Sequence, residues 1–80
     1  MLDSKTRELI AIGCSVAANC RPCVKYHVGK AREMGIEAEA IDDAVEVGQM
    51  VRKGAAGETD KLLTQLTGQQ PPRPKNCLEN

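Results

Sequence analysis

The sequence predicts a small all-α protein, and three features of the chain support this prediction. Apolar residues recur at the spacing of one helix face, residues that start or stop helices separate the apolar stretches, and no convincing segment alternates as a strand does. The chain has 80 residues and a single aromatic side chain, Tyr26, so its core is thin. Chains of this size usually need disulfides, metal or self-association, and we expect a homo-oligomer.

The first helix is expected at residues 4–18. Asp3 and Ser4 carry side chains of the kind that cap helix N-termini. Apolar residues on both sides of this cap form one broad stripe. The stripe consists of Leu2, Leu9, Ile10, Ile12, Val16 and Ala17. Ala18 and Asn19 then offer a tight turn, which ends this helix.

The second helix is expected to begin near Cys20 and to end near Gly35. Pro22 is compatible with the first turn of a helix, where backbone amides have no partner within the helix. The apolar side of this helix consists of Val24, Val28, Ala31 and Met34. Because a short turn joins the first two helices, we expect them to form an antiparallel helical hairpin.

A third helix is expected between acidic residues near Glu37 and basic residues at Arg52 and Lys53, and Gly54 is expected to close it. Met50 is assigned to the core. The apolar face of this helix consists of Ile41, Ala44, Val45, Val47, Met50 and Val51. One or two further helices therefore complete the hairpin, and their number depends on whether the helix stops at Gly54.

Small residues at 55–57 predict a break, followed by a short fourth helix at 58–66 with Leu62, Leu63 and Leu66 as its apolar face. The alternative is a third helix that continues with a kink. In either case residues 1–67 form one helical core domain. Residues 68–80 are rich in proline and polar side chains, which predicts a poorly ordered tail.

Charge and hydropathy exclude several classes of partner. Eleven basic residues balance eleven acidic ones without a basic cluster, so no nucleic-acid partner is expected. The first residues lack the apolar run of a secretory signal, and no apolar stretch is long enough to cross a bilayer. We therefore expect a cytoplasmic protein with no membrane partner. A secreted disulfide framework of four cysteines is then not expected, and the close pair Cys20 and Cys23 indicates catalysis or metal binding instead.

The candidate site is the segment from Cys20 to His27, which contains two thiols and the only histidine. Cys23 and His27 are four residues apart, so a helix places them on one face within reach of each other. Glu8 precedes the turn by about as many residues as His27 follows it, and at about 1.5 Å of rise per residue the two lie within one helical turn. We therefore expect a contact between Glu8 and His27.

These residue types suit thiol chemistry. A thiol reacts as its thiolate, which a helix N-terminus and a neighbouring base both favour. Cys23 is placed to act as the nucleophile, His27 to accept its proton, and Glu8 to orient the imidazole and stabilise its charged form. Cys20, with two residues between it and Cys23, is placed to resolve the oxidised thiol.

The four residues and their spacings resemble the signature of the alkylhydroperoxidase AhpD-like branch of the carboxymuconolactone decarboxylase family. Lys5–Ala11 and Val24–His27 resemble parts of the first two core helices of that family, and the resemblance extends over about residues 2–66. It implies an all-helical fold that assembles as a homo-oligomer, such as a trimer or a hexamer. The chain corresponds to about one core unit of the family, and Pro22 stands where some peroxidases have a histidine.

The resemblance also implies a reaction. In the peroxidase members, the residue at the position of Cys23 forms a sulfenic acid with peroxide, and the residue at the position of Cys20 converts it to a disulfide. The residues at the positions of Glu8 and His27 relay protons. The expected substrate is thus a hydroperoxide, the expected reductant is a dithiol, and no cofactor is required.

Several alternatives use the same residues. The two cysteines could ligate zinc together with His27 and either Glu8 or a group from a partner chain, although zinc sites usually include a second pair of ligands. The chain could instead be an oligomeric redox adaptor or sensor without catalysis. A third alternative is decarboxylase-like lactone chemistry, which does not depend on a cysteine pair. Cys14 is assigned to packing on the first helix and Cys77 to the tail.

Overall fold

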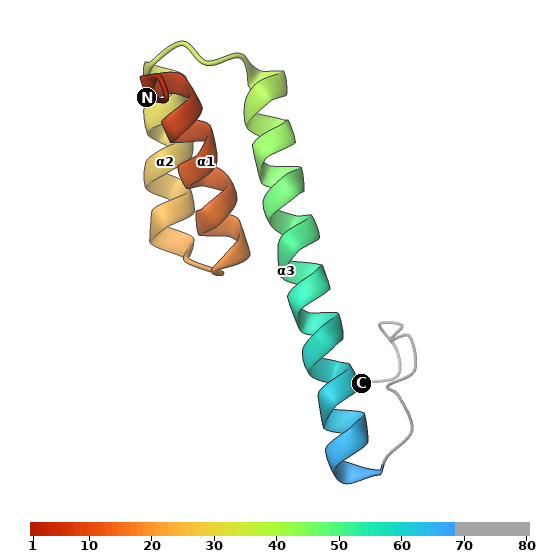
Figure 1. Cartoon of the computed structure of the whole chain (residues 1–80). Helices are drawn as coiled ribbons and strands as arrows, with labels where there is room; N and C mark the ends of the chain where they lie inside the picture. The colour runs from red at the N-terminus through yellow and green to blue at the C-terminus, as the bar shows by residue number, and fades with distance from the viewer. Residues whose placement is uncertain (69–80) are drawn as a thin grey trace.

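A computed structural model of the chain describes residues 1–68 (Figure 1). The described residues form three α-helices and no strand, which confirms the all-α class. The helices are α1 (Ser4–Ala17), α2 (Arg21–Glu33) and α3 (Ala38–Thr67). The predicted tail, including Cys77, lies outside the described residues apart from its first position, Gly68.

Helix α1 begins where the sequence predicts because Asp3 caps it. The Asp3 carboxylate accepts a hydrogen bond from the backbone N–H of Thr6 at 2.7 Å. This hydrogen bond lowers the pKa of Asp3 below its ordinary value of 3.8. After α1, Asn19 takes a left-handed conformation with φ 57°, which a short polar side chain tolerates and which turns the chain toward α2.

Helix α2 starts at the residue after Cys20, which is its N-cap, and Pro22 lies in its first turn. It ends just before Gly35, whose φ of 77° requires the left-handed region that glycine adopts at low cost. Helices α1 and α2 pack against each other and lie side by side (Figure 1).

Helix α3 is one continuous helix of 30 residues, so the predicted closure at Gly54 and the predicted break at 55–57 are wrong. The backbone at Gly54 and Gly57 stays helical, because a glycine inside a helix costs only about 1 kcal/mol relative to alanine. The end comes at Gly68, which has φ 69° and donates its N–H to the carbonyl of Thr64.

The core lies between α1 and the first half of α3, and α2 closes it. Its buried apolar side chains are Ile12, Ala31, Ile36 and Ile41. Helices α1 and α3 approach each other closely at Gly48, where an added Cβ would lie 2.6 Å from the carbonyl oxygen of Gly13 and 2.7 Å from Cβ of Val16. A side chain at this position would therefore push the two helices apart.

The second half of α3 extends beyond α1 and α2 (Figure 1). Its leucines, Leu62, Leu63 and Leu66, are exposed. Two assignments are wrong: Met50, assigned to the core, is 65% exposed, and Cys14, assigned to packing on the first helix, is an exposed free thiol. Both side chains lie outside the narrow stripe along which the three helices cover one another. No helix within residues 1–68 has the length and apolar character needed to cross a membrane.

Candidate functional site

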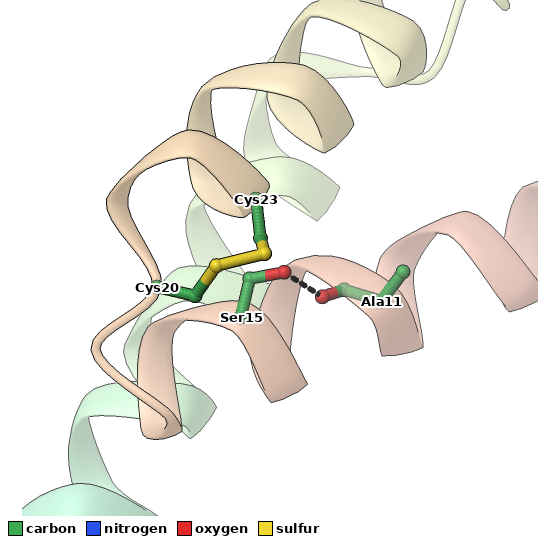
Figure 2. The surroundings of a disulfide bond; sticks show 4 residues. All are labelled: Ala11, Ser15, Cys20 and Cys23. Atoms are coloured by element: carbon green, nitrogen blue, oxygen red, sulfur yellow. Dashed lines mark hydrogen bonds between the residues drawn. A yellow bond between two sulfur atoms is a disulfide. The ribbon is translucent and has the colours of Figure 1, made fainter.

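The two cysteines of the candidate site are joined by a disulfide at the start of α2 (Figure 2). Cys20 is the N-cap and Cys23 lies in the first helical turn, with 5.2 Å between their Cα atoms. Residues three apart lie on the same face of a helix, which brings the two sulfur atoms together. Both residues are half-buried, and the structure thus shows the pair in its oxidised form.

Ser15 of α1 lies beside this disulfide, as Figure 2 shows. Its side chain is buried and its hydroxyl donates to the carbonyl of Ala11 at 2.7 Å. Its own carbonyl accepts the backbone N–H of Cys20 at 3.0 Å. Ser15 thus fixes the N-cap of α2 against α1. The sequence did not indicate this contact, because it is made by the backbone carbonyl, which every residue carries.

Glu8 of α1 and His27 of α2 are in direct contact, as their spacing predicts: Oε2 of Glu8 pairs with Nδ1 of His27. The Glu8 side chain is only 16% exposed and that of His27 is 28% exposed, so water screens this pair weakly. A carboxylate can only accept a hydrogen bond, so Nδ1 carries the proton and Nε2 holds the free lone pair of the neutral imidazole. The contact therefore holds the imidazole ring in one orientation.

The ring of His27 is also held by its neighbour Tyr26. The two ring centroids are 5.0 Å apart and the ring planes meet at 81°, which is an edge-to-face contact. Tyr26 itself is exposed, so the only aromatic residue of the chain lies beside the candidate site and outside the core. Contacts on two sides limit the orientations that the imidazole can take.

The structure thus brings the four predicted site residues together as two pairs, Cys20 with Cys23 and Glu8 with His27. Within residues 1–68, no hydrogen bond joins His27 to either cysteine, whose sulfur atoms are bonded to each other. The same part of the chain contains no group of three or more His, Cys, Asp and Glu side chains arranged to hold a metal ion. The catalytic roles of the four residues stay predictions.

A cavity of about 680 Å³ opens beside Cys20, between the turn that precedes α2 and the middle of α3. Arg52 of α3 reaches across to this turn. Its Nη1 donates to the side-chain oxygen of Asn19 at 3.0 Å and to the carbonyl of Val16 at 3.3 Å. The sequence placed Arg52 at a helix end; because α3 continues, it lies mid-helix and connects α3 to the turn. No local signal could have indicated this contact, since it joins residues far apart in the chain.

The sequence also matches known proteins. The model of the carboxymuconolactone decarboxylase family matches residues 1–61, which include the whole site. A protein of Paracoccus denitrificans, named "Uncharacterized protein 4 in cox locus", is 38% identical over 66 residues, which are 81% of this chain and 60% of that protein. The chain therefore spans about 60% of the length of this curated relative. No solved structure matches significantly. On the family match, the chain belongs to the carboxymuconolactone decarboxylase family.

Proposed function

We propose that this protein is a thiol-dependent peroxidase that reduces hydroperoxides with the Cys20–Cys23 pair and moves protons through His27 and Glu8. The observation that carries the proposal is the contact of Glu8 on α1 with His27 on α2, the helix that carries the disulfide at its start. Membership of the family supports the proposal, because the family includes peroxidase-like enzymes.

The start of α2 suits the reactive thiol. Helix N-termini carry unpaired N–H groups and a partial positive charge, which stabilise an anion nearby. Cys20 makes no side-chain capping hydrogen bond at this end, and Cys23 lies in the first turn. In the reduced protein, a Cys23 thiolate would therefore gain from the helix end as well as from His27, which lies one turn further along the same face.

The proposed reaction balances in two steps. Nε2 of His27 takes the proton of Cys23, and the thiolate attacks one peroxide oxygen. The O–O bond breaks, the alcohol leaves with the proton from the imidazolium, and Cys23 becomes a sulfenic acid. The thiol of Cys20 then attacks this sulfur, the S–O bond breaks, and water leaves as the disulfide forms. The sum is two thiols plus a hydroperoxide giving a disulfide, an alcohol and water.

We further propose an antiparallel hairpin of α1 and α2 as the active unit and a homo-oligomer, such as a trimer or a hexamer, as the assembly. The apolar side chains that remain exposed on α1 and α3 support self-association, because a monomer rarely leaves so much apolar surface uncovered. The main exposed ones along these helices are Ile10, Val47, Met50, Val51, Leu62, Leu63 and Leu66.

The decisive experiment follows thiol loss after reduced protein is mixed with a hydroperoxide, in a background where Cys14 and Cys77 are serine. The wild-type pair should lose two thiols rapidly for each peroxide. Cys20→Ser should also react rapidly but stop at a sulfenic acid that dimedone traps, whereas Cys23→Ser should show no rapid reaction. Slow oxidation that is indifferent to Cys23→Ser would overturn the proposal in favour of a redox adaptor or sensor.

A further inference from the structure

We propose that the cavity beside Cys20 binds the carboxylate of a small thiol and presents the sulfur of that thiol to Cys20. The inference rests on the proposed function, since it assigns the class of reductant that restores the same disulfide. It starts from the unequal charge of the cavity lining. Three basic side chains line the cavity, Arg21, Lys25 and Arg52, and no acidic side chain does.

This local excess of positive charge is not a property of the whole chain, in which eleven basic residues balance eleven acidic ones. Ion pairs among the described residues do not neutralise it either. The ion pairs within residues 1–68 are Glu8–His27 and Glu58–Lys61, so none of the three basic side chains has an acidic partner there. Three unpaired cations around one cavity attract an anion, and apolar neighbours such as Val24 and Val45 reduce the competing hydration.

Within the described part of the chain, the guanidinium of Arg52 has free hydrogen-bond donors that can bind a carboxylate. A guanidinium has five N–H donors, and only Nη1 of Arg52 is engaged, by Asn19 and Val16. The donors on Nη2 and Nε have no partner among the described residues, and they are the pair that can hold a carboxylate through two parallel hydrogen bonds. Because Nη1 is already fixed to the turn, less side-chain freedom is lost when the ligand binds.

The position of the cavity selects one of the two sulfur atoms. Cys20 contributes to the lining and Cys23 does not. A thiol whose carboxylate is held by Arg52 therefore meets Cys20 first. The cavity volume of about 680 Å³ suits a small molecule, and its open side also lets a longer carrier reach in.

The reduction step balances as a thiol–disulfide exchange. The ligand thiol loses its proton and its thiolate attacks Sγ of Cys20. The Cys20–Cys23 bond breaks, the electron pair leaves on Sγ of Cys23, and that thiolate takes up a proton. A second thiol, from the same or another molecule, then attacks the ligand sulfur of the mixed disulfide. The ligand leaves as its own disulfide, and Cys20 takes up a proton.

The test compares 3-mercaptopropionate with its methyl ester, which keeps the thiol and the carbon chain but lacks the charge. Oxidised protein with Cys14 and Cys77 as serine is mixed with each thiol, without peroxide, at constant pH and ionic strength. The rate constant for disulfide reduction is measured per thiolate. A charge-assisted hydrogen bond predicts that the acid reacts about tenfold faster than the ester. Peptide mapping should find the mixed disulfide on Cys20.

Variants test which side chains cause the preference for the acid over the ester. Arg52→Gln should reduce the ratio of acid to ester rate constants toward one. The ratio cancels any change that loss of the contacts with Asn19 and Val16 causes for both thiols alike. Arg21→Gln and Lys25→Gln should each reduce it in part; neither side chain makes a hydrogen bond to another described residue, so folding is not at risk. Lys30→Gln, an exposed basic residue of α2 outside the cavity, is the matched control and should keep the ratio.

Equal rates for acid and ester in the wild type would overturn the inference. So would a mixed disulfide found on Cys23, or a preference that survives when Arg21, Lys25 and Arg52 are all replaced by Gln. Because no peroxide is present, the result does not depend on peroxidase activity. A protein that fails as a peroxidase can still prefer the acid, and an active peroxidase can lack the preference.

Discussion

Glu8 and His27 are the residues on which the proposed proton transfer depends. The Glu8 carboxylate contributes to this transfer in two ways. The carboxylate fixes which ring nitrogen carries the proton, and its negative charge stabilises the imidazolium once His27 has accepted a second proton. Both contributions are stronger for side chains that are mostly shielded from water, as these are. A substitution that changes only the tautomer of His27 should therefore slow the oxidation of Cys23 nearly as much as loss of the imidazole ring.

We expect His27→Gln to slow the oxidation of Cys23 by peroxide roughly 100-fold, the lower end of what a positioned base contributes. Glu8→Gln should cause a loss of similar size, because the new amide can donate to Nδ1 and move the proton to Nε2, where the free lone pair is needed. Rapid-mixing measurements of thiol loss against pH check both variants. Glu33→Gln is the control, since this glutamate is exposed and is the last residue of α2, at the opposite end of the helix from the disulfide.

A rate for Glu8→Gln within twofold of the wild type would show that the carboxylate has no part in the reaction, whatever its contact with His27. Circular dichroism should accompany the kinetics, since a partly buried unpaired imidazole can also lower stability.

At the scale of residues, the sequence predicted those contacts that regular helix geometry determines. The rise of a helix and the place of a turn are enough to bring Glu8 to His27, and a spacing of three residues is enough to bring Cys20 to Cys23. The contact of Arg52 with the turn is different, because it depends on how α3 is rotated and shifted against α1. The spacing of residues along the sequence does not indicate how these two helices pack.

At the scale of elements, the glycines of the chain show why the end of α2 was predicted and the end of α3 was not. Gly35 and Gly68 have positive φ, at 77° and 69°, and both end helices. Gly54 and Gly57 lie inside α3 with helical backbone. A glycine permits a helix to end but does not force it to, and the alanines and charged residues around 54–58 favour helix enough to outweigh its cost.

This difference gives a matched pair of substitutions on one helix. Gly48→Ala would place a Cβ against Gly13 and Val16, so we expect it to lower the free energy of unfolding by roughly 1–3 kcal/mol, as overpacking does. Gly54→Ala meets no atom within 4 Å and should raise the free energy of unfolding by roughly 0.5–1 kcal/mol, because alanine favours helix over glycine. Urea unfolding followed by circular dichroism measures both.

A stabilising Gly54→Ala requires that α3 be continuous at this position. If the helix ended there instead, with glycine in a left-handed conformation, the same substitution would be destabilising. Gly57→Ala has equally open surroundings and repeats the test one turn later.

At the scale of the whole molecule, a small core contrasts with a large uncovered apolar surface. The buried apolar residues are few, namely Ile12, Val16, Ala31, Ile36 and Ile41. A second cavity, of about 540 Å³, runs as a groove between α1 and α3 and is lined mainly by apolar side chains. Val47 and Val51, each 52% exposed, form part of its lining, as does the free thiol of Cys14. A second copy of the chain is the occupant that we expect here, because the core alone is too small for a stable monomer.

We expect Val47→Glu to dissociate the oligomer, because a charge in a buried apolar interface is left without a partner. Light scattering after size-exclusion chromatography measures the mass. The thermal midpoint of the wild type should rise with protein concentration, and that of the variant should not, since only association depends on concentration. Lys30→Gln changes the net charge by the same amount at an exposed site and should leave the mass unaltered.

The position of this groove also predicts what dissociation leaves intact. The groove and the cavity beside Cys20 share no lining residue, so association through the groove covers neither Arg52 nor Cys20. Val47→Glu should therefore expose Cys14 to faster maleimide labelling, in a background with Cys77 as serine, while the rate of disulfide reduction by 3-mercaptopropionate stays within about twofold. Equal labelling of Cys14 in both proteins would place the interface elsewhere. A large fall in the reduction rate would instead mean that assembly through the groove helps to shape the cavity on the other side of α3.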